Sequence, residues 1–195
     1  MHQRKHTIKT FLSLLAFIGF TYSSMLFSAV ADEKYAFVDI GNSSYEIESE
    51  SVSATGWRIG AGYFFNESLS FEAMWISQGE KSESYVDGEG SGKETISLEG
   101  IQLAISGTKT FTNSLDVFAR VGLYFWEASY RDVYNGSLWA SADDDGNDIF
   151  FGAGVRYPMT NALSAIFSYD IISIDIEGIS ADANRWALGA SYNFQ

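Results

Sequence analysis

Apolar and mixed side chains alternate with a period of two along much of this chain. Between Leu115 and Phe125 every odd position is apolar, while Asp116 and Arg120 lie among the even positions. Successive side chains of an extended strand point to opposite faces, so this alternation predicts a strand with one apolar and one mixed face. No segment after the first thirty residues has a convincing helical period. We therefore expect an all-β protein.

Eight stretches show the alternation, and the segments between them differ in length in a regular way. The predicted strands cover residues 36–41, 57–63, 69–75, 100–106, 115–125, 151–157, 163–170 and 186–194. The intervening segments 64–68, 108–114 and 158–162 are short, whereas 42–55, 79–95, 129–148 and 173–184 are long and polar. This order predicts an eight-stranded antiparallel up-and-down β-barrel with short turns at one end and long loops at the other.

The mixed faces of these strands carry ionisable residues. They are Asp39, Arg58, Glu72, Asp116, Arg120, Arg156 and Asp170. A soluble barrel would bury these groups around an apolar ligand, which carries a large desolvation cost. The opposite arrangement, with apolar faces in lipid and charges in the lumen, is typical of a transmembrane barrel of the bacterial outer membrane. We predict a lumenal charge network, with Arg58 near Glu72 on the adjacent strand, and Arg120 and Arg156 near the aspartates.

Aromatic residues lie near both ends of the predicted strands. Two lipid-facing girdles are expected, with Trp57, Trp75, Phe125 and Trp186 toward the long loops and Tyr63, Tyr157, Tyr192 and Phe194 toward the short turns. The long loops would then be extracellular and the short turns periplasmic.

The first thirty-one residues differ from the rest. A basic start with Arg4, Lys5 and Lys9 precedes an apolar run, and Ala29 and Ala31 form an A-x-A site. These are the parts of a secretory signal peptide, and the alternative is a retained membrane anchor. We expect residues 1–31 to be the signal and 32–195 the barrel domain. Cleavage would remove three cations from a chain of net charge −13, which gives −16.

Composition limits the chemistry available to the mature chain. Its negative charge argues against nucleic-acid binding. The sequence has no cysteine, and both of its histidines, His2 and His6, lie in the predicted signal. A serine nucleophile needs an adjacent general base, so we expect no enzyme and no cofactor.

One acidic segment is a weak candidate for a metal site. Asp143, Asp145 and Asp148 offer the oxygen ligands that calcium prefers. The glycine and closing glutamate of an EF-hand loop are not at the required positions. The alternative is a solvated hairpin loop.

Several strands resemble the OmpA-like transmembrane domain family. Residues 115–122 resemble its fifth strand, 100–103 its fourth, 152–157 its sixth and 188–194 its closing strand. The resemblance extends over 32–195 and implies an outer-membrane barrel inserted by the barrel-assembly machinery, which reads the C-terminal strand. Phe194 is followed by Gln195, a small departure from a terminal aromatic residue.

The family's lumenal gate is not reproduced residue for residue. Glu72 matches its carboxylate, but Ser106 stands at the lysine position, Ile166 at the arginine position and Arg156 at an acidic position. The periplasmic peptidoglycan-binding domain of larger members is not expected here.

The resemblance implies a structural and surface-interaction role. The expected partners are outer-membrane lipid, lipopolysaccharide and a surface ligand of the loops. A narrow or gated channel through the charged lumen is the alternative, and a lipid-modifying enzyme is a third hypothesis.

Overall fold

The computed structural model describes residues 33–47, 50–112, 115–176 and 179–194. The predicted signal segment with Ala29 and Ala31, and Gln195, lie outside the described residues. None of the described segments forms a helix long and apolar enough to cross a membrane.

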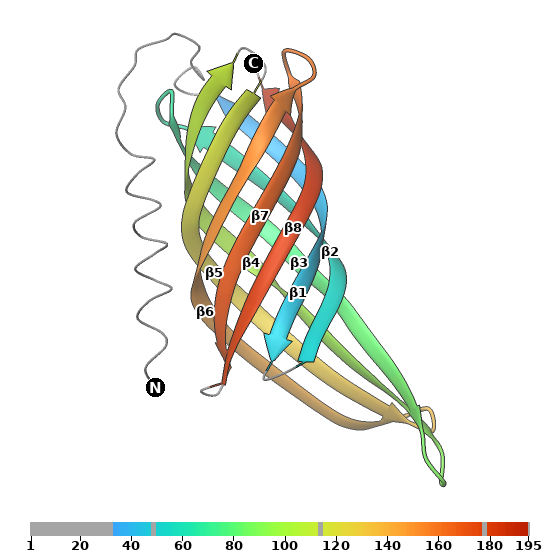
Figure 1. The fold of residues 1–195 in the computed structure, drawn as a ribbon. Coiled ribbons are helices and arrows are strands. Elements are labelled where there is room, and N and C mark those ends of the chain that lie inside the picture. Colours follow the sequence, from blue (N-terminus) through green and yellow to red (C-terminus); the bar gives the residue numbers. More distant parts are fainter. Residues whose placement is uncertain (1–32, 48–49, 113–114, 177–178, 195) are drawn as a thin grey trace.

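Eight antiparallel strands form a closed barrel, with each strand paired to its neighbours in sequence and β1 paired to β8 (Figure 1). The strands are β1 (Lys34–Ile47), β2 (Glu50–Phe64), β3 (Leu69–Val86), β4 (Ser91–Thr112), β5 (Leu115–Tyr134), β6 (Ser137–Pro158), β7 (Leu163–Ile176) and β8 (Ile179–Phe194). The predicted all-β up-and-down architecture and its short turns are confirmed.

Most of the described residues in the segments expected to be long loops belong to strands, which corrects the sequence-based prediction. For example, Asn42 pairs with Thr55, and the pairing continues to Ile47 and Glu50. Polar residues interrupt the hydrophobic alternation in these segments, whereas backbone ladders do not depend on side-chain polarity.

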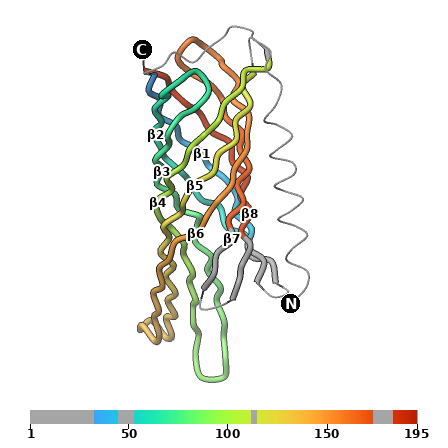
Figure 2. Tube along the Cα trace, turned by 90° about the vertical axis from the view of Figure 1, so that its left-hand side faces the viewer, coloured from blue at the N-terminus to red at the C-terminus, as the bar shows by residue number. Residues whose placement is uncertain are grey.

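The β3–β4 and β5–β6 hairpins are longer than the others, and together they make a four-stranded sheet that projects beyond the barrel (Figure 2). The ladder between β2 and β3 starts at Trp57–Ser77, and that between β6 and β7 starts at Phe150–Ile172. The ladders within β3–β4–β5–β6 continue as far as Val86 and Tyr134. We call the part made of residues 80–98 and 128–148 the extension.

The tips of the two long hairpins are joined to each other. Asn135 donates its backbone N–H to the Ser91 carbonyl oxygen over 2.9 Å, and its side-chain oxygen accepts the Ser91 N–H over 3.1 Å. Asn135 and Gly136 have φ of 48° and 78°, the values of a type I′ hairpin turn. The extension is therefore a single hydrogen-bonded sheet and not a pair of separate loops.

The interior of the barrel is arranged in layers along its axis. Large apolar side chains fill both ends, with Phe37 and Phe118 toward the short turns and Tyr124 and Phe150 toward the extension. Charged side chains lie between them. Most large apolar side chains of the other face are exposed on the outer surface, as the alternation predicts.

Candidate functional site

The charged layer is a continuous chain of ion pairs across the lumen. Its members share burial inside the barrel and contact at least one opposite charge: Asp39, Arg58, Glu72, Arg120, Asp170 and Arg185. We call this set the lumenal network. It contains equal numbers of acids and bases, so the network is neutral.

Asp39 on β1 joins two arginines. Arg185 on β8 places its Nη2 2.6 Å from Asp39 Oδ1, and Arg58 on β2 places its Nη2 2.7 Å from Oδ2. Both carboxylate oxygens are therefore used, as a buried carboxylate requires.

Asp170 on β7 connects strands that are not neighbours in the barrel. Its Oδ2 lies 2.8 Å from Nη1 of Arg58, and its Oδ1 lies 2.8 Å from Nη2 of Arg120 on β5. Arg120 also reaches Glu72 Oε2 on β3 at 3.3 Å, and Glu72 accepts the Tyr35 hydroxyl at 2.5 Å. The pairs thus link opposite walls of the barrel.

A glycine makes the central pair possible. Gly152 pairs in register with Arg120 on one side and with Asp170 on the other. A Cβ at this position would lie 2.1 Å from Asp170 Oδ1 and 2.8 Å from Arg120 Nε. The two charged groups meet in the space that the missing side chain leaves.

Six of the seven charges predicted from the sequence are buried in the barrel, but they are not all paired as expected. Arg58 pairs with Asp39 and Asp170, and no described contact joins it to Glu72; these residues are four positions apart in the β2–β3 register. Asp116 lies at the strand end, where it accepts the Thr110 hydroxyl at 2.6 Å, and it does not contact the network among the described residues.

Arg156 is buried but makes no salt bridge within the part of the chain that the structure describes. Its guanidinium carbon lies 4.9 Å from the centre of the Tyr35 ring and 5.7 Å from that of Phe118. Arg156 is therefore held by aromatic faces rather than by the expected aspartates.

Sequence reasoning missed Arg185. The predicted eighth strand begins at Trp186, whereas β8 begins at Ile179. Extending the same alternation back by one position places Arg185 on the face of Ala187 and Gly189, which is the lumenal face. The signal was therefore present in the pattern.

The lumen around the network is filled by side chains. A cavity of about 10 Å³ lies between Arg58, Arg120 and Arg156. This is about the room that one water molecule needs.

The weak calcium candidate does not form a cluster. Asp143 and Asp145 share the outer face of β6, whereas Asp148 points to the other face, where it accepts the Trp126 Nε1–H at 2.7 Å. Alternating faces of a strand separate residues of odd and even number. Among the described residues no group of three or more histidine, cysteine or acidic side chains is placed to hold a metal.

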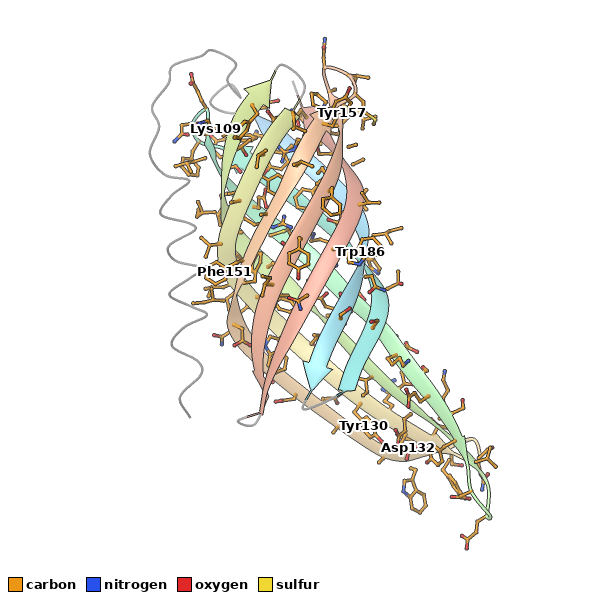
Figure 3. The ribbon with its side chains drawn as sticks, in the orientation of Figure 1. Lys109, Tyr130, Asp132, Phe151, Tyr157 and Trp186 are labelled. Atoms are coloured by element: carbon orange, nitrogen blue, oxygen red, sulfur yellow. The ribbon has the colours of Figure 1, made fainter. Side chains whose placement is uncertain are left out.

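The aromatic residues expected in the girdles all lie exposed on the outer surface of the barrel: Trp57, Trp75, Phe125, Trp186, Tyr63, Tyr157, Tyr192 and Phe194. In Figure 3, Tyr157 lies near the short turns and Trp186 farther along the barrel toward the extension. Their position at lipid boundaries stays a prediction.

Comparison with known sequences identifies a family model over almost the whole chain. The model of the outer membrane protein beta-barrel domain matches residues 12–194. No curated protein gives a significant match.

Solved structures share the fold at low sequence identity. Ail, the attachment invasion locus protein of Yersinia pestis, was crystallised with the heparin analogue sucrose octasulfate; it is 11% identical with a TM-score of 0.61, over 85% of this chain and all of that one. Neisserial surface protein A is 15% identical with a TM-score of 0.62, over 83% and 97%. OprG of Pseudomonas aeruginosa is 13% identical with a TM-score of 0.59, over 86% and 98%.

Proposed function

The chain belongs to the outer membrane protein β-barrel domain family, and we propose that this member is a closed barrel whose role is to present the extension as a binding surface outside the cell. The protein is a β-barrel of the bacterial outer membrane. A transmembrane strand needs about 9–11 residues, so β4 and β6, with 22 residues each, are far longer than the membrane requires. The extension is the single observation that carries the proposal.

The side chains of the extension support an interaction role. Trp139 and Leu138 are 75% and 64% exposed near the tip of β6. Large apolar side chains gathered on a water-exposed tip are typical of interaction sites. Ail, which has the same fold, was crystallised with a bound heparin analogue, so a scaffold of this shape can bind surface ligands.

The lumen does not favour the channel alternative. The lumenal network closes the middle of the barrel, and the cavity beside it has a volume of about 10 Å³. Eight-stranded barrels have an interior just wide enough for side chains to fill. We therefore propose that the charges hold the walls together rather than conduct ions. We also propose that the protein is not an enzyme, because the sequence has no cysteine and its two histidines lie in the predicted signal.

Other proposals follow from the family. Residues 1–31 would be removed during export, β8 would be read by the assembly machinery, and the outer wall would contact lipid and lipopolysaccharide.

Surface labelling tests the proposed orientation directly. The chain has no cysteine, so Ser84→Cys in the extension and Asn161→Cys in the β6–β7 turn each introduce a single thiol. On intact cells a membrane-impermeant maleimide should label Ser84→Cys and leave Asn161→Cys unlabelled until the cells are broken. Labelling of Asn161→Cys alone would contradict the proposal.

A further inference from the structure

One face of the extension combines aromatic rings with carboxylates. This face continues the lumenal face of the barrel beyond its rim, and the tilted strands carry it to one side of the barrel (Figure 1). Its residues are Tyr85, Tyr130, Tyr134 and Trp139 together with Glu83, Glu94 and Asp132. Lys81 lies on the same face, with its Nζ 3.7 Å from Glu83 Oε1. We call it the acidic aromatic face; Figure 3 labels Tyr130 and Asp132 on it.

The rings near the tip are packed against each other over a glycine. Gly92 pairs with Tyr85 on one side and Tyr134 on the other. A Cβ at Gly92 would lie 2.2 Å from Tyr85 Cζ, so the ring lies over the bare backbone. The two tyrosine rings have centroids 6.3 Å apart at 23°, and Trp139 lies 5.9 Å from Tyr134 at 58°. Together they form a continuous aromatic surface.

Carboxylates fix the orientation of these tyrosines. The Tyr85 hydroxyl donates to the two oxygens of Asp132 at 3.0 and 3.1 Å. The Tyr134 hydroxyl donates to Asp87 at 2.8 Å, and Asp87 also accepts the N–H groups of Glu89 and Gly90. The polar edges of the rings are thus held by the protein, and Tyr85 and Tyr134 remain partly exposed.

The acidic aromatic face carries a larger excess of acidic over basic side chains than the opposite face of the extension. Glu83, Glu94 and Asp132 follow one another in register on β3, β4 and β5. Like charges directly opposite each other on neighbouring strands destabilise a sheet. The opposite face carries Lys93 and Arg131 beside Glu80 on these strands, and Asp143 and Asp145 on β6.

We propose that the acidic aromatic face binds a segment of polypeptide rich in arginine and lysine. This inference rests on the proposed function and names the class of its partner. Guanidinium and ammonium groups are attracted to the faces of tryptophan and tyrosine rings, and a cation relieves the repulsion within the row of carboxylates. A sulfated polysaccharide is negatively charged, like the carboxylates of this face, so the ligand class seen with Ail is not expected to bind here.

Binding of a labelled nona-arginine peptide to the purified barrel in neutral detergent micelles tests the proposal. Fluorescence anisotropy should show saturable binding that weakens as salt rises, and a nona-glutamate peptide and sucrose octasulfate should not bind. Trp139→Ala should weaken nona-arginine binding about tenfold, because aromatic residues supply much of the binding energy at such sites.

A matched pair of charge variants separates this face from the net charge of the protein. Glu94→Gln lies on the acidic aromatic face and Glu80→Gln on the opposite face, and both remove one negative charge. We expect a several-fold loss for Glu94→Gln and a change of less than twofold for Glu80→Gln. Equal losses, no binding, or tighter binding of sucrose octasulfate would overturn the inference.

The labelling experiment distinguishes the two levels of the proposal. If Ser84→Cys is labelled on intact cells and the peptide does not bind, the partner class is wrong and the surface role stands. If Ser84→Cys is not labelled, the proposed function itself fails.

Discussion

Arg120 and Asp170 meet directly over Gly152, with Nη2 of the arginine 2.8 and 2.9 Å from the two carboxylate oxygens. The pair joins β5 to β7 across β6, and the absence of a side chain on β6 is what lets it form.

Gly152→Ala should therefore destabilise the barrel. The added methyl group would displace both charged groups, and overpacking of this kind costs about 1–3 kcal/mol. Urea unfolding in lipid vesicles, followed by tryptophan fluorescence, measures the change. Gly107→Ala is the matched control, because a Cβ there meets only ordinary contacts at 3.7 Å and beyond. Equal stability of Gly152→Ala and Gly107→Ala would show that the space over Gly152 is not needed.

Asp170→Asn should be more harmful than a change at the rim. Asp170 is a shared partner of Arg58 and Arg120, and removing one member of a buried pair costs about 3–5 kcal/mol. Asp116→Asn at the strand end should change the free energy of unfolding by less than about 0.5 kcal/mol. The double variant Arg120→Gln/Asp170→Asn should lose less free energy of unfolding than the sum of the losses of the two single variants, since the partners act together. Additive losses would argue against a coupled network.

The extension should contain a tyrosine that resists ionisation. Partial burial and the hydrogen bond donated to Asp132 raise the pKa of Tyr85 from 10.0 to about 12. A raised pKa means that the stabilising contribution is complete below pH 10 and is lost as the pH rises through about 12. Titration of tyrosinate absorbance in the folded barrel should show a late step that is missing in Tyr85→Phe. Identical titrations of the two proteins would refute the Tyr85–Asp132 contact.

The filled lumen predicts an electrically silent barrel. In planar bilayers the wild-type protein should show no reproducible unit conductance, because the lumenal network and the aromatic layers on either side close the path. Unit conductance that disappears or changes in Glu72→Gln would instead support a gated channel.

The barrel itself was predictable because lipid and lumen impose opposite demands on alternate residues. Val121 and Leu123 on the outer wall and Arg120 on the inner one follow that rule, and the eight strands were found by it. The position of Arg185 obeys the same rule, and it was missed only because the predicted strand starts at Trp186.

The extension escaped prediction because both of its faces are outside the membrane. Segments such as 80–86 carry polar residues on both faces, so the alternation that marks the membrane strands is interrupted. A local signal was present in Asn135-Gly136, the dipeptide preferred in type I′ hairpin turns, which lies within the expected loop 129–148.

The exact ion pairs could not have been deduced from the strands alone. Arg58 and Asp170 are on β2 and β7, which are not neighbours, and their contact depends on the size of the side chains between them. The contact of Arg120 with Asp170 depends in turn on the space at Gly152 of β6, between the two strands.

The five tryptophans allow the most direct test of the inside-out barrel. Trp57, Trp75 and Trp186 are exposed on the outer wall, Trp126 is buried in the lumen, and Trp139 lies on the extension. Variants that retain one tryptophan each, reconstituted into bilayers with brominated acyl chains, report contact with lipid through fluorescence quenching. We expect strong quenching of the three outer-wall tryptophans and little quenching of Trp126 and Trp139. Quenching of Trp126 together with protection of Trp57, Trp75 and Trp186 would contradict the assignment of the apolar faces to lipid.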